Sequence, residues 1–300
     1  MGNTFYLSWE PTLMAALQNF LGDAGANIAT MITMLGEETV MVVILGFIYW
    51  CYDKKFGVYV GTNLMTGLVA NPMIKNIFLR YRPYMVHPEV QCLKPVHEGD
   101  LYDPLLQGYS FPSGHTSNSA TMYFSLPVYG KKKWLLVLGI LMPFLIGLSR
   151  VALGVHYPTD VMAGWLLGAV VVALMTFLQK KIQVKWKLYL LITLLTIPGC
   201  FYCTSNDYFN GLGMMIGFFA ASLFEEKYVQ FENTKDVKKS IIRVVGGLAI
   251  FLLANVVLKA VFGLIGMEEP AYFIRVIRYG MLVFITMGVY PMVFKWKKIF

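Results

Sequence analysis

The sequence predicts an all-α fold, a polytopic bundle of helices in a membrane. Of the 300 residues, 57% are apolar and only 14% are charged, whereas soluble domains carry roughly 25% charged residues. The mean hydropathy is +0.59. The apolar residues form long runs that end at short clusters of lysine, as in proteins whose helices cross a bilayer several times. The net charge of +8 therefore fits the flanks of membrane helices, and we expect no nucleic-acid partner.

The amino-terminal part differs from the later apolar runs. Residues 9–35 carry apolar side chains at helical spacing, but Gly22, Asp23 and Gly25 divide them. Each piece is shorter than the roughly 20 residues that a span needs. We expect an interfacial or re-entrant segment here, with a bent span as the alternative. The first residues lack the basic start and apolar core of a cleavable signal peptide.

Nine apolar runs are interpreted as spans: residues 39–52, 56–79, 115–128, 134–148, 159–178, 188–202, 209–224, 241–265 and 272–294. Two spans separate each basic cluster from the next, the clusters being 54–55, 131–133, 180–187, 235–239 and 295–298. The positive-inside rule places all five clusters in the cytoplasm. It then predicts that four segments face outward, namely 80–114, 149–158, 204–207 and 266–271.

Three short motifs fall in or beside the segments predicted to face outward. They are Lys75 with Arg82-Pro83, the run Pro112-Ser113-Gly114-His115, and Ser149-Arg150 followed by His156 and Asp160. Lys75 and Arg82 are seven residues apart, about two helical turns, so we expect them on one face of a helix and its extension, which Pro83 ends. Arginine forks and a lysine charge suit the geometry of a phosphate. The pattern predicts an anion site at the outer side of the membrane.

The second and third motifs add groups that could transfer a phosphoryl group. Ser113 is a suitable N-cap, and Gly114 lets the free N–H groups of a helix start approach an anion. His115 would then stand beside the phosphate as a proton donor. A carboxylate from Asp160 on one nitrogen of His156 would leave the other nitrogen nucleophilic. Attack on phosphorus gives a phosphohistidine that water hydrolyses, and the cations offset the charge without a metal.

In order and spacing, these motifs resemble those of the type 2 phosphatidic acid phosphatase superfamily, over about residues 40–180. That superfamily includes membrane lipid phosphatases and undecaprenyl pyrophosphate phosphatases. The resemblance implies a six-helix phosphatase core and metal-independent hydrolysis without a cofactor. It implies that His115 is the acid, His156 the nucleophile and Asp160 its orienting partner. It implies phosphate binding by Lys75, Arg82, Ser113, Gly114 and Arg150. We therefore expect a lipid phosphate hydrolase of the cell membrane whose site faces outward.

Two regions are expected: residues 1–183, a phosphatase core with the amino-terminal helices, and residues 184–300, additional transmembrane helices. The added spans could form a lipid-facing wall, a dimer surface or a gate for substrate. Basic residues lie near the outer ends of the last two spans, namely Lys259, Arg275 and Arg278, with Glu268 and Glu269 between them. Mutual ion pairing or snorkelling is the ordinary explanation. The functional one is a second anion contact, for a diphosphate or a lipid headgroup.

Other functional classes stay open at this stage. A phosphotransferase would pass the phosphoryl group to another lipid, and a lipid transporter or scaffold would only bind it. Binding alone needs no nucleophile, so the histidine pair favours an enzyme. Phosphatidate, phosphatidylglycerol phosphate and a polyprenyl diphosphate are alternative substrates, and the oligomeric state is open. Cys200 and Cys203 have no second pair, so we expect lipid-buried thiols rather than a zinc site.

Overall fold

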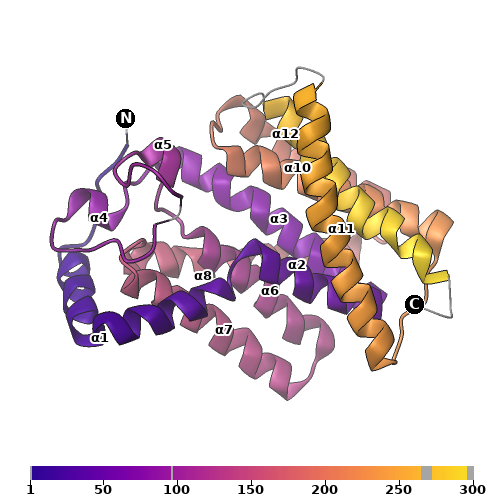
Figure 1. The fold of residues 1–300 in the computed structure, drawn as a ribbon, viewed down its shortest axis with the longest axis horizontal. Coiled ribbons are helices and arrows are strands. Elements are labelled where there is room, and N and C mark those ends of the chain that lie inside the picture. Colours follow the sequence, from indigo (N-terminus) through magenta and orange to yellow (C-terminus); the bar gives the residue numbers. More distant parts are fainter. Residues whose placement is uncertain (1, 96, 265–271, 296–300) are drawn as a thin grey trace. The chain divides into compact units, whose positions relative to one another are not determined.

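The computed structural model describes residues 2–95, 97–264 and 272–295 (Figure 1). Its α-helices are α1 (Trp9–Met34), α2 (Glu38–Phe47), α3 (Lys54–Phe78), α4 (Pro83–Val86), α5 (Pro104–Gln107), α6 (Gly114–Gly130), α7 (Lys133–Ala152), α8 (Pro158–Lys181), α9 (Lys185–Thr196), α10 (Asn206–Phe224), α11 (Val237–Leu264) and α12 (Tyr272–Phe284). Short π or 3₁₀ turns extend several of them: η1 (Ile48–Tyr52), η2 (Ile197–Phe201), η3 (Glu225–Val229), η4 (Ile285–Val289) and η5 (Tyr290–Lys295). Within these ranges no strands pair into a sheet, so the all-α prediction is confirmed.

The helices form two compact units. The first consists of Met1–Val40, Ala70–Val172 and Cys203–Ser205, and the second of Met41–Val69, Ala173–Tyr202 and Asn206–Phe300. Because α3 and α8 each contribute to both units, this division does not follow the boundary expected after residue 183. The functional division at that residue stays a prediction.

Close packing of α8 on α6 brings two parts of the predicted site together in the first unit. A Cβ added to Gly164 would lie 3.1 Å from the carbonyl oxygen of Ser113, and one added to Gly168 would lie 2.5 Å from Cβ of Ala120. Small residues permit such approach between membrane helices. Since α7 also packs on α6 and α1, the starts of α6 and α8 are held beside the end of α7.

The amino-terminal helix α1 is part of the first unit and packs on α7. The expected interruption occurs at Gly22, whose φ of 54° and ψ of −164° are non-helical. Near its start, however, α1 buries Glu10, Pro11 and Met14, while Trp9 and Leu13 are exposed. A charged side chain is buried there because it meets a buried arginine, as described below.

Fewer helices have the length and hydropathy of a span than the nine expected. Among the described residues four do, namely α7, α8, α11 and the segment Tyr272–Lys295, or five if α1 and Glu38–Tyr52 form one bent span. Helix α3 has 25 residues but buries polar side chains such as Asn63, Asn71 and Lys75. Polar side chains that face other helices lower the hydropathy of a helix, so hydropathy alone does not identify α3 as a span.

In the second unit, α10 packs on α12 almost backbone to backbone. A Cβ added to Gly213 would overlap the carbonyl oxygen of Val276. Helix α11 is attached at its start by Arg243, whose Nη1 donates to the carbonyl oxygens of Trp50, at 2.7 Å, and Glu232, at 2.8 Å. These contacts attach α11, in which only Arg243, Gly247 and Leu258 are buried, to other parts of the second unit.

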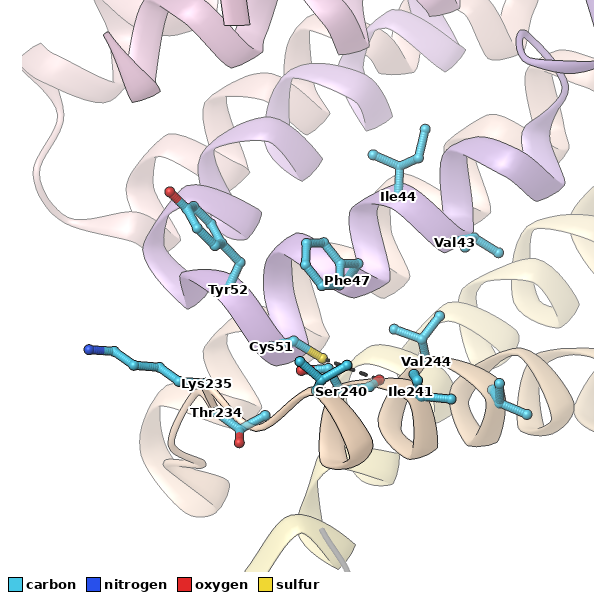
Figure 2. A pocket seen from close by; sticks show the side chains of 12 residues that line it. Val43, Ile44, Phe47, Cys51, Tyr52, Thr234, Lys235, Ser240, Ile241 and Val244 are labelled. Carbon is cyan, nitrogen blue, oxygen red and sulfur yellow. Dashed lines mark hydrogen bonds between the residues drawn. The ribbon is translucent and has the colours of Figure 1, made fainter. Parts of the chain in front are cut away.

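An apolar groove of about 860 Å³ lies in the second unit, between α2 with η1 and the start of α11 (Figure 2). Its lining is Val43, Ile44, Phe47, Cys51, Tyr52, Thr234, Lys235, Val237, Ser240, Ile241, Val244 and Val245. Polar groups gather at one end, where Sγ of Cys51 donates to the carbonyl oxygen of Ser240 at 3.7 Å. None of the motif residues lines this groove.

Candidate active site

All the motif residues lie in the first unit, and most are buried. The charged or polar ones with almost no exposed surface are Lys75, Arg82, Ser113, Ser149, Arg150, His156 and Asp160. Burying a charge is costly unless partners compensate it. The contacts of these residues therefore show how the site is held.

Arg82 does not lie on an extension of the helix that carries Lys75. Helix α3 ends at Phe78, Leu79 has a φ of +49°, and Arg82 is extended. Pro83 starts the short helix α4 instead of ending α3, so that part of the prediction is wrong. Proline suits the first position of a helix because no N–H is needed there.

The guanidinium of Arg82 joins two loops. Its Nε and Nη2 donate to the carbonyl oxygen of Gln107, at 3.1 and 2.7 Å, and Nε also donates to Gly108, at 2.9 Å. Its Nη1 donates to the carbonyl oxygen of Val155 at 2.9 Å. The loop before α6 is thus tied to the loop before α8, and a fixed positive charge lies next to His156.

The start of α6 is capped as predicted. The Ser113 side chain accepts hydrogen bonds from the backbone N–H and the hydroxyl of Thr116, at 3.4 and 2.9 Å. Its own N–H donates to the carbonyl oxygen of Asp160 at 3.1 Å. A Cβ added to Gly114 would lie 4.0 Å from Nζ of Lys75. The helix start and a lysine therefore face the same space, as an anion site requires.

His156 lies in the loop between α7 and α8, and Asp160 lies in the first turn of α8, as expected. Nδ1 of His156 is 3.6 Å from Oδ2 of Asp160, which is long for a hydrogen bond. The Ser110 hydroxyl comes between them: it donates to Asp160 Oδ2 and lies 3.3 Å from Nδ1. Because that hydroxyl donates its only hydrogen bond to the carboxylate, it accepts a hydrogen bond from the N–H at Nδ1 of His156. This arrangement leaves Nε2 without the proton.

Arg150 is in the last turn of α7, and its Nη1 donates to the Thr33 hydroxyl at 3.0 Å. Its Nε finds no acceptor in the described part of the chain. A buried guanidinium N–H without an acceptor is available to an anionic ligand.

His115, the second residue of α6, is half-buried. Its imidazole interacts electrostatically with His156 and with the cations Lys75, Arg82 and Arg150. The structure thus brings the two histidines and the three cations of the separate motifs together. Their catalytic roles stay predictions.

Buried residues outside the motifs also belong to this site. Besides Ser110, they include Asn71, whose Nδ2 donates to Oγ of Ser117 at 2.9 Å, and Arg80, whose Nη1 donates to Asp160 Oδ1 at 2.7 Å. The sequence shows Ser110 two residues before the second motif and Arg80 two residues before Arg82. In the sequence, only their closeness to a motif indicated that Ser110 and Arg80 could belong to the site.

The basic residues proposed as a second anion contact belong to the second unit. Lys259 is exposed, whereas Arg278 is buried with its guanidinium carbon 4.6 Å from the centre of the Tyr279 ring. Glu268 and Glu269 lie outside the described residues. A role of Lys259, Arg275 and Arg278 in binding an anion stays a prediction.

Together, the helices and the site define a class: a helical membrane protein with histidines and fixed cations around a capped helix start. Comparisons with known proteins agree. Residues 56–183 match the family model of the PAP2 superfamily, and residues 209–299 match that of the PAP2 superfamily phosphatase, transmembrane extension. The chain belongs to the PAP2 superfamily, so the resemblance inferred from the motifs is confirmed.

Individual relatives cover different shares of the chain. An undecaprenyl-diphosphatase from Sulfolobus acidocaldarius is 32% identical over 39% of this chain and 52% of the relative. Phosphatidylglycerophosphatase B from Bacillus subtilis is 31% identical over 52% of this chain and 76% of the relative. The crystal structure of Aquifex aeolicus LpxE has a TM-score of 0.50 and 26% identity, covering 59% of this chain and 99% of that one. The protein is thus an integral membrane protein of the phosphatase class.

Proposed function

We propose that this protein is a membrane lipid phosphatase that hydrolyses a phosphate monoester or diphosphate of a lipid at the extracytoplasmic face. The reaction passes through a phosphohistidine and needs no metal. The observation that carries the proposal is the setting of His156, a buried imidazole whose Nδ1 faces a hydroxyl and a carboxylate among three cations. Relatives named for a lipid diphosphate and a lipid monophosphate support both substrate classes.

In the first step, Nε2 of His156 attacks phosphorus while the bond from phosphorus to the lipid oxygen breaks. His115 gives its proton to that oxygen, so the lipid leaves as an alcohol or, from a diphosphate, as a monophosphate. The imidazole gains positive charge, which Asp160 offsets across the Ser110 hydroxyl. Lys75 and the Nε of Arg150 stabilise the oxygens of the phosphoryl group.

In the second step, water attacks the phosphohistidine and the bond from phosphorus to Nε2 breaks. His115, now neutral, takes the proton from the water as a general base. Phosphate leaves, and His156 returns to the neutral tautomer with its proton on Nδ1. Water therefore replaces the lipid alcohol, and no redox partner is required.

The charge pattern of the sequence supports an outward-facing site. Basic residues at 131–133 and 180–181 flank the ends of α7 and α8 that are distant in sequence from Arg150 and His156. The positive-inside rule puts those lysines in the cytoplasm. The catalytic ends of both helices then lie at the other face.

The purified protein in detergent should release phosphate from lipid phosphates with a chelator present. Release should be measured over a panel of lipid monophosphates and diphosphates, and again with lipid alcohols added as acceptors. Phosphate as the product supports a hydrolase, and a phosphorylated acceptor would make the protein a phosphotransferase. No turnover of any lipid, or turnover only with an added divalent ion, contradicts the proposal.

The pH profile of kcat/KM should keep its activity below the ordinary histidine pKa of about 6.5. Burial, and then the charges of Arg82, Arg150 and Lys75, lower the pKa of His156 well below that value. His156 therefore stays neutral at neutral pH and becomes protonated, and so inactive as a nucleophile, only as the pH falls through its lowered pKa. Arg150→Gln removes one opposing charge, so its acid limb should move to higher pH.

This profile is measured between about pH 4 and pH 8 on the wild type and the Arg150→Gln variant. Both profiles are corrected for the second ionisation of the substrate phosphate, near pH 6. A wild-type acid limb at or above pH 6.5 after that correction would contradict the environment described for His156.

A further inference from the structure

Arg80 is a fully buried cation to which the proposed reaction gives no part. Its side chain is 1% exposed. Nη1 donates to Oδ1 of Asp160 at 2.7 Å and to the hydroxyl of Thr159 at 2.8 Å. Nη2 donates to Oε2 of Glu10 at 3.1 Å. The guanidinium therefore lies between a carboxylate of the site and a carboxylate of the amino-terminal helix.

The backbone of Arg80 contacts the other partner of His156. Its carbonyl oxygen accepts the N–H of Ser110 at 2.7 Å. Asn3 pairs with Arg80 in an isolated parallel bridge, in which Asn3 N donates to Leu79 O and Tyr81 N donates to Asn3 O. One residue thus fixes both the hydroxyl and the carboxylate that face Nδ1.

Glu10 uses both of its oxygens and is completely buried. Oε1 accepts the backbone N–H of Thr159 at 2.9 Å and its hydroxyl at 2.7 Å. Oε2 accepts the N–H of Leu7 at 2.8 Å in addition to Nη2 of Arg80. Glu10 therefore fixes Arg80 and the first turn of α8 at once.

Aromatic rings complete the enclosure of Arg80. The guanidinium carbon lies 3.8 Å from the centre of the Tyr157 ring and 4.5 Å from that of Phe5. Such rings attract a cation and exclude water from it. Away from water, the ion pairs are screened little and their geometry is fixed.

We propose that Arg80 and Glu10 are positioning residues for the nucleophile. Arg80 fixes Asp160 and Ser110 so that they hold the Nδ1–H of His156, and Glu10 fixes Arg80 from the amino-terminal segment. The two carboxylates and the guanidinium together carry one negative charge, opposite to the charge that the imidazole gains on attack. The inference rests on the proposed function.

The test compares Arg80→Lys and Glu10→Gln with the wild type. Loss of groups that orient a catalytic ligand commonly costs about 10- to 100-fold in activity, so kcat should fall by that factor in both variants. KM and the inhibition constant of inorganic phosphate should stay within about twofold, because the cations that contact phosphate are unchanged. Trp165→Phe is the matched control: it removes a 2.9 Å hydrogen bond from α8 to Pro143 O and should leave kcat unchanged.

The pH profile gives a readout that a merely structural role would not move. The charged or titratable groups that face His156 are Lys75, Arg82, Arg150, His115 and Asp160. Glu10→Gln removes a negative charge behind this set, which makes the imidazolium less favourable. Its acid limb should therefore move to lower pH, whereas that of Trp165→Phe should coincide with the wild type.

Three results would overturn the positioning role. In Arg80→Lys and Glu10→Gln, these are a kcat within about twofold of the wild type, or equal changes in kcat and the phosphate inhibition constant. In Glu10→Gln, the third is an acid limb at the same pH as that of the wild type. If a variant is not recovered as folded protein, Thr159→Val replaces it. This change removes the hydroxyl between Arg80 and Glu10 but no charge. It should lower kcat and leave the phosphate inhibition constant unchanged. A wild type that releases no phosphate would instead refute the proposed function.

Discussion

Replacing His156 by alanine should abolish phosphate release, lowering kcat by about 10⁴-fold or more. The proposed reaction has no other nucleophile, since the second imidazole, His115, is assigned to proton transfer. The variant also loses the group that Ser110 and Asp160 orient. The measurement is single-turnover release of phosphate from a lipid phosphate in detergent, together with trapping of phosphohistidine in alkaline quench.

The matched control for this variant is His97→Ala. His97 is an exposed histidine of the loop between α4 and α5, and its structural contacts there run through its backbone, to the side chain of Gln107. We expect it to keep wild-type activity. If His156→Ala retained more than about a hundredth of the wild-type rate, or still formed a phosphoenzyme, the covalent mechanism would have to be abandoned.

Replacing His115 by asparagine should have an effect that depends on the leaving group. General acid catalysis contributes about 10²- to 10⁴-fold, and a lipid alcohol needs that proton to leave. With a lipid monophosphate, kcat should therefore fall by this factor. With an aryl phosphate, whose leaving group is stable as an anion, the loss should be at most about tenfold. Both substrates are measured on the same preparation.

A lipid diphosphate extends this test to the identity of the substrate. Its leaving group is a lipid monophosphate, which is stable as an anion at neutral pH because its second pKa is near 6. His115→Asn should then spare diphosphate hydrolysis relative to monoester hydrolysis. Equal losses on all three substrates would show that His115 binds phosphate rather than donating a proton.

Local features of the chain predicted the fold class and most of the residues that the structure gathers at the candidate site. Apolar runs and lysine clusters are properties of neighbouring residues, so they indicated membrane helices without knowledge of the packing. The capping of α6 by Ser113 and the place of Asp160 in the first turn of α8 depend on only a few residues each. Additional transmembrane helices were expected at residues 184–300, and residues 209–299 match the transmembrane extension of the superfamily. None of the three motifs lies in that part, so the motifs predicted no role for it.

Predictions about how residues on either side of a turn lie relative to each other were less reliable. The seven-residue spacing of Lys75 and Arg82 indicated one continuous helical face, but Leu79 takes a positive φ and the chain pairs with Asn3. A residue distant in sequence thus decides where α3 ends. For the same reason, the direct contact expected between His156 and Asp160 is bridged by the hydroxyl of Ser110, which lies 46 residues before His156 in the chain.

By itself, the sequence determined that this is a helical membrane protein whose motif histidines and cations suit a phosphate. Only the tertiary structure decided which contacts surround His156 and Asp160, through Ser110, Arg80 and Glu10. Glu10 and Arg80 are 70 residues apart, and Arg80 and Asp160 are 80 apart. A buried ion pair between such distant residues leaves no periodicity or spacing in the chain. It forms because burial makes each charge unfavourable until the fold supplies its partner.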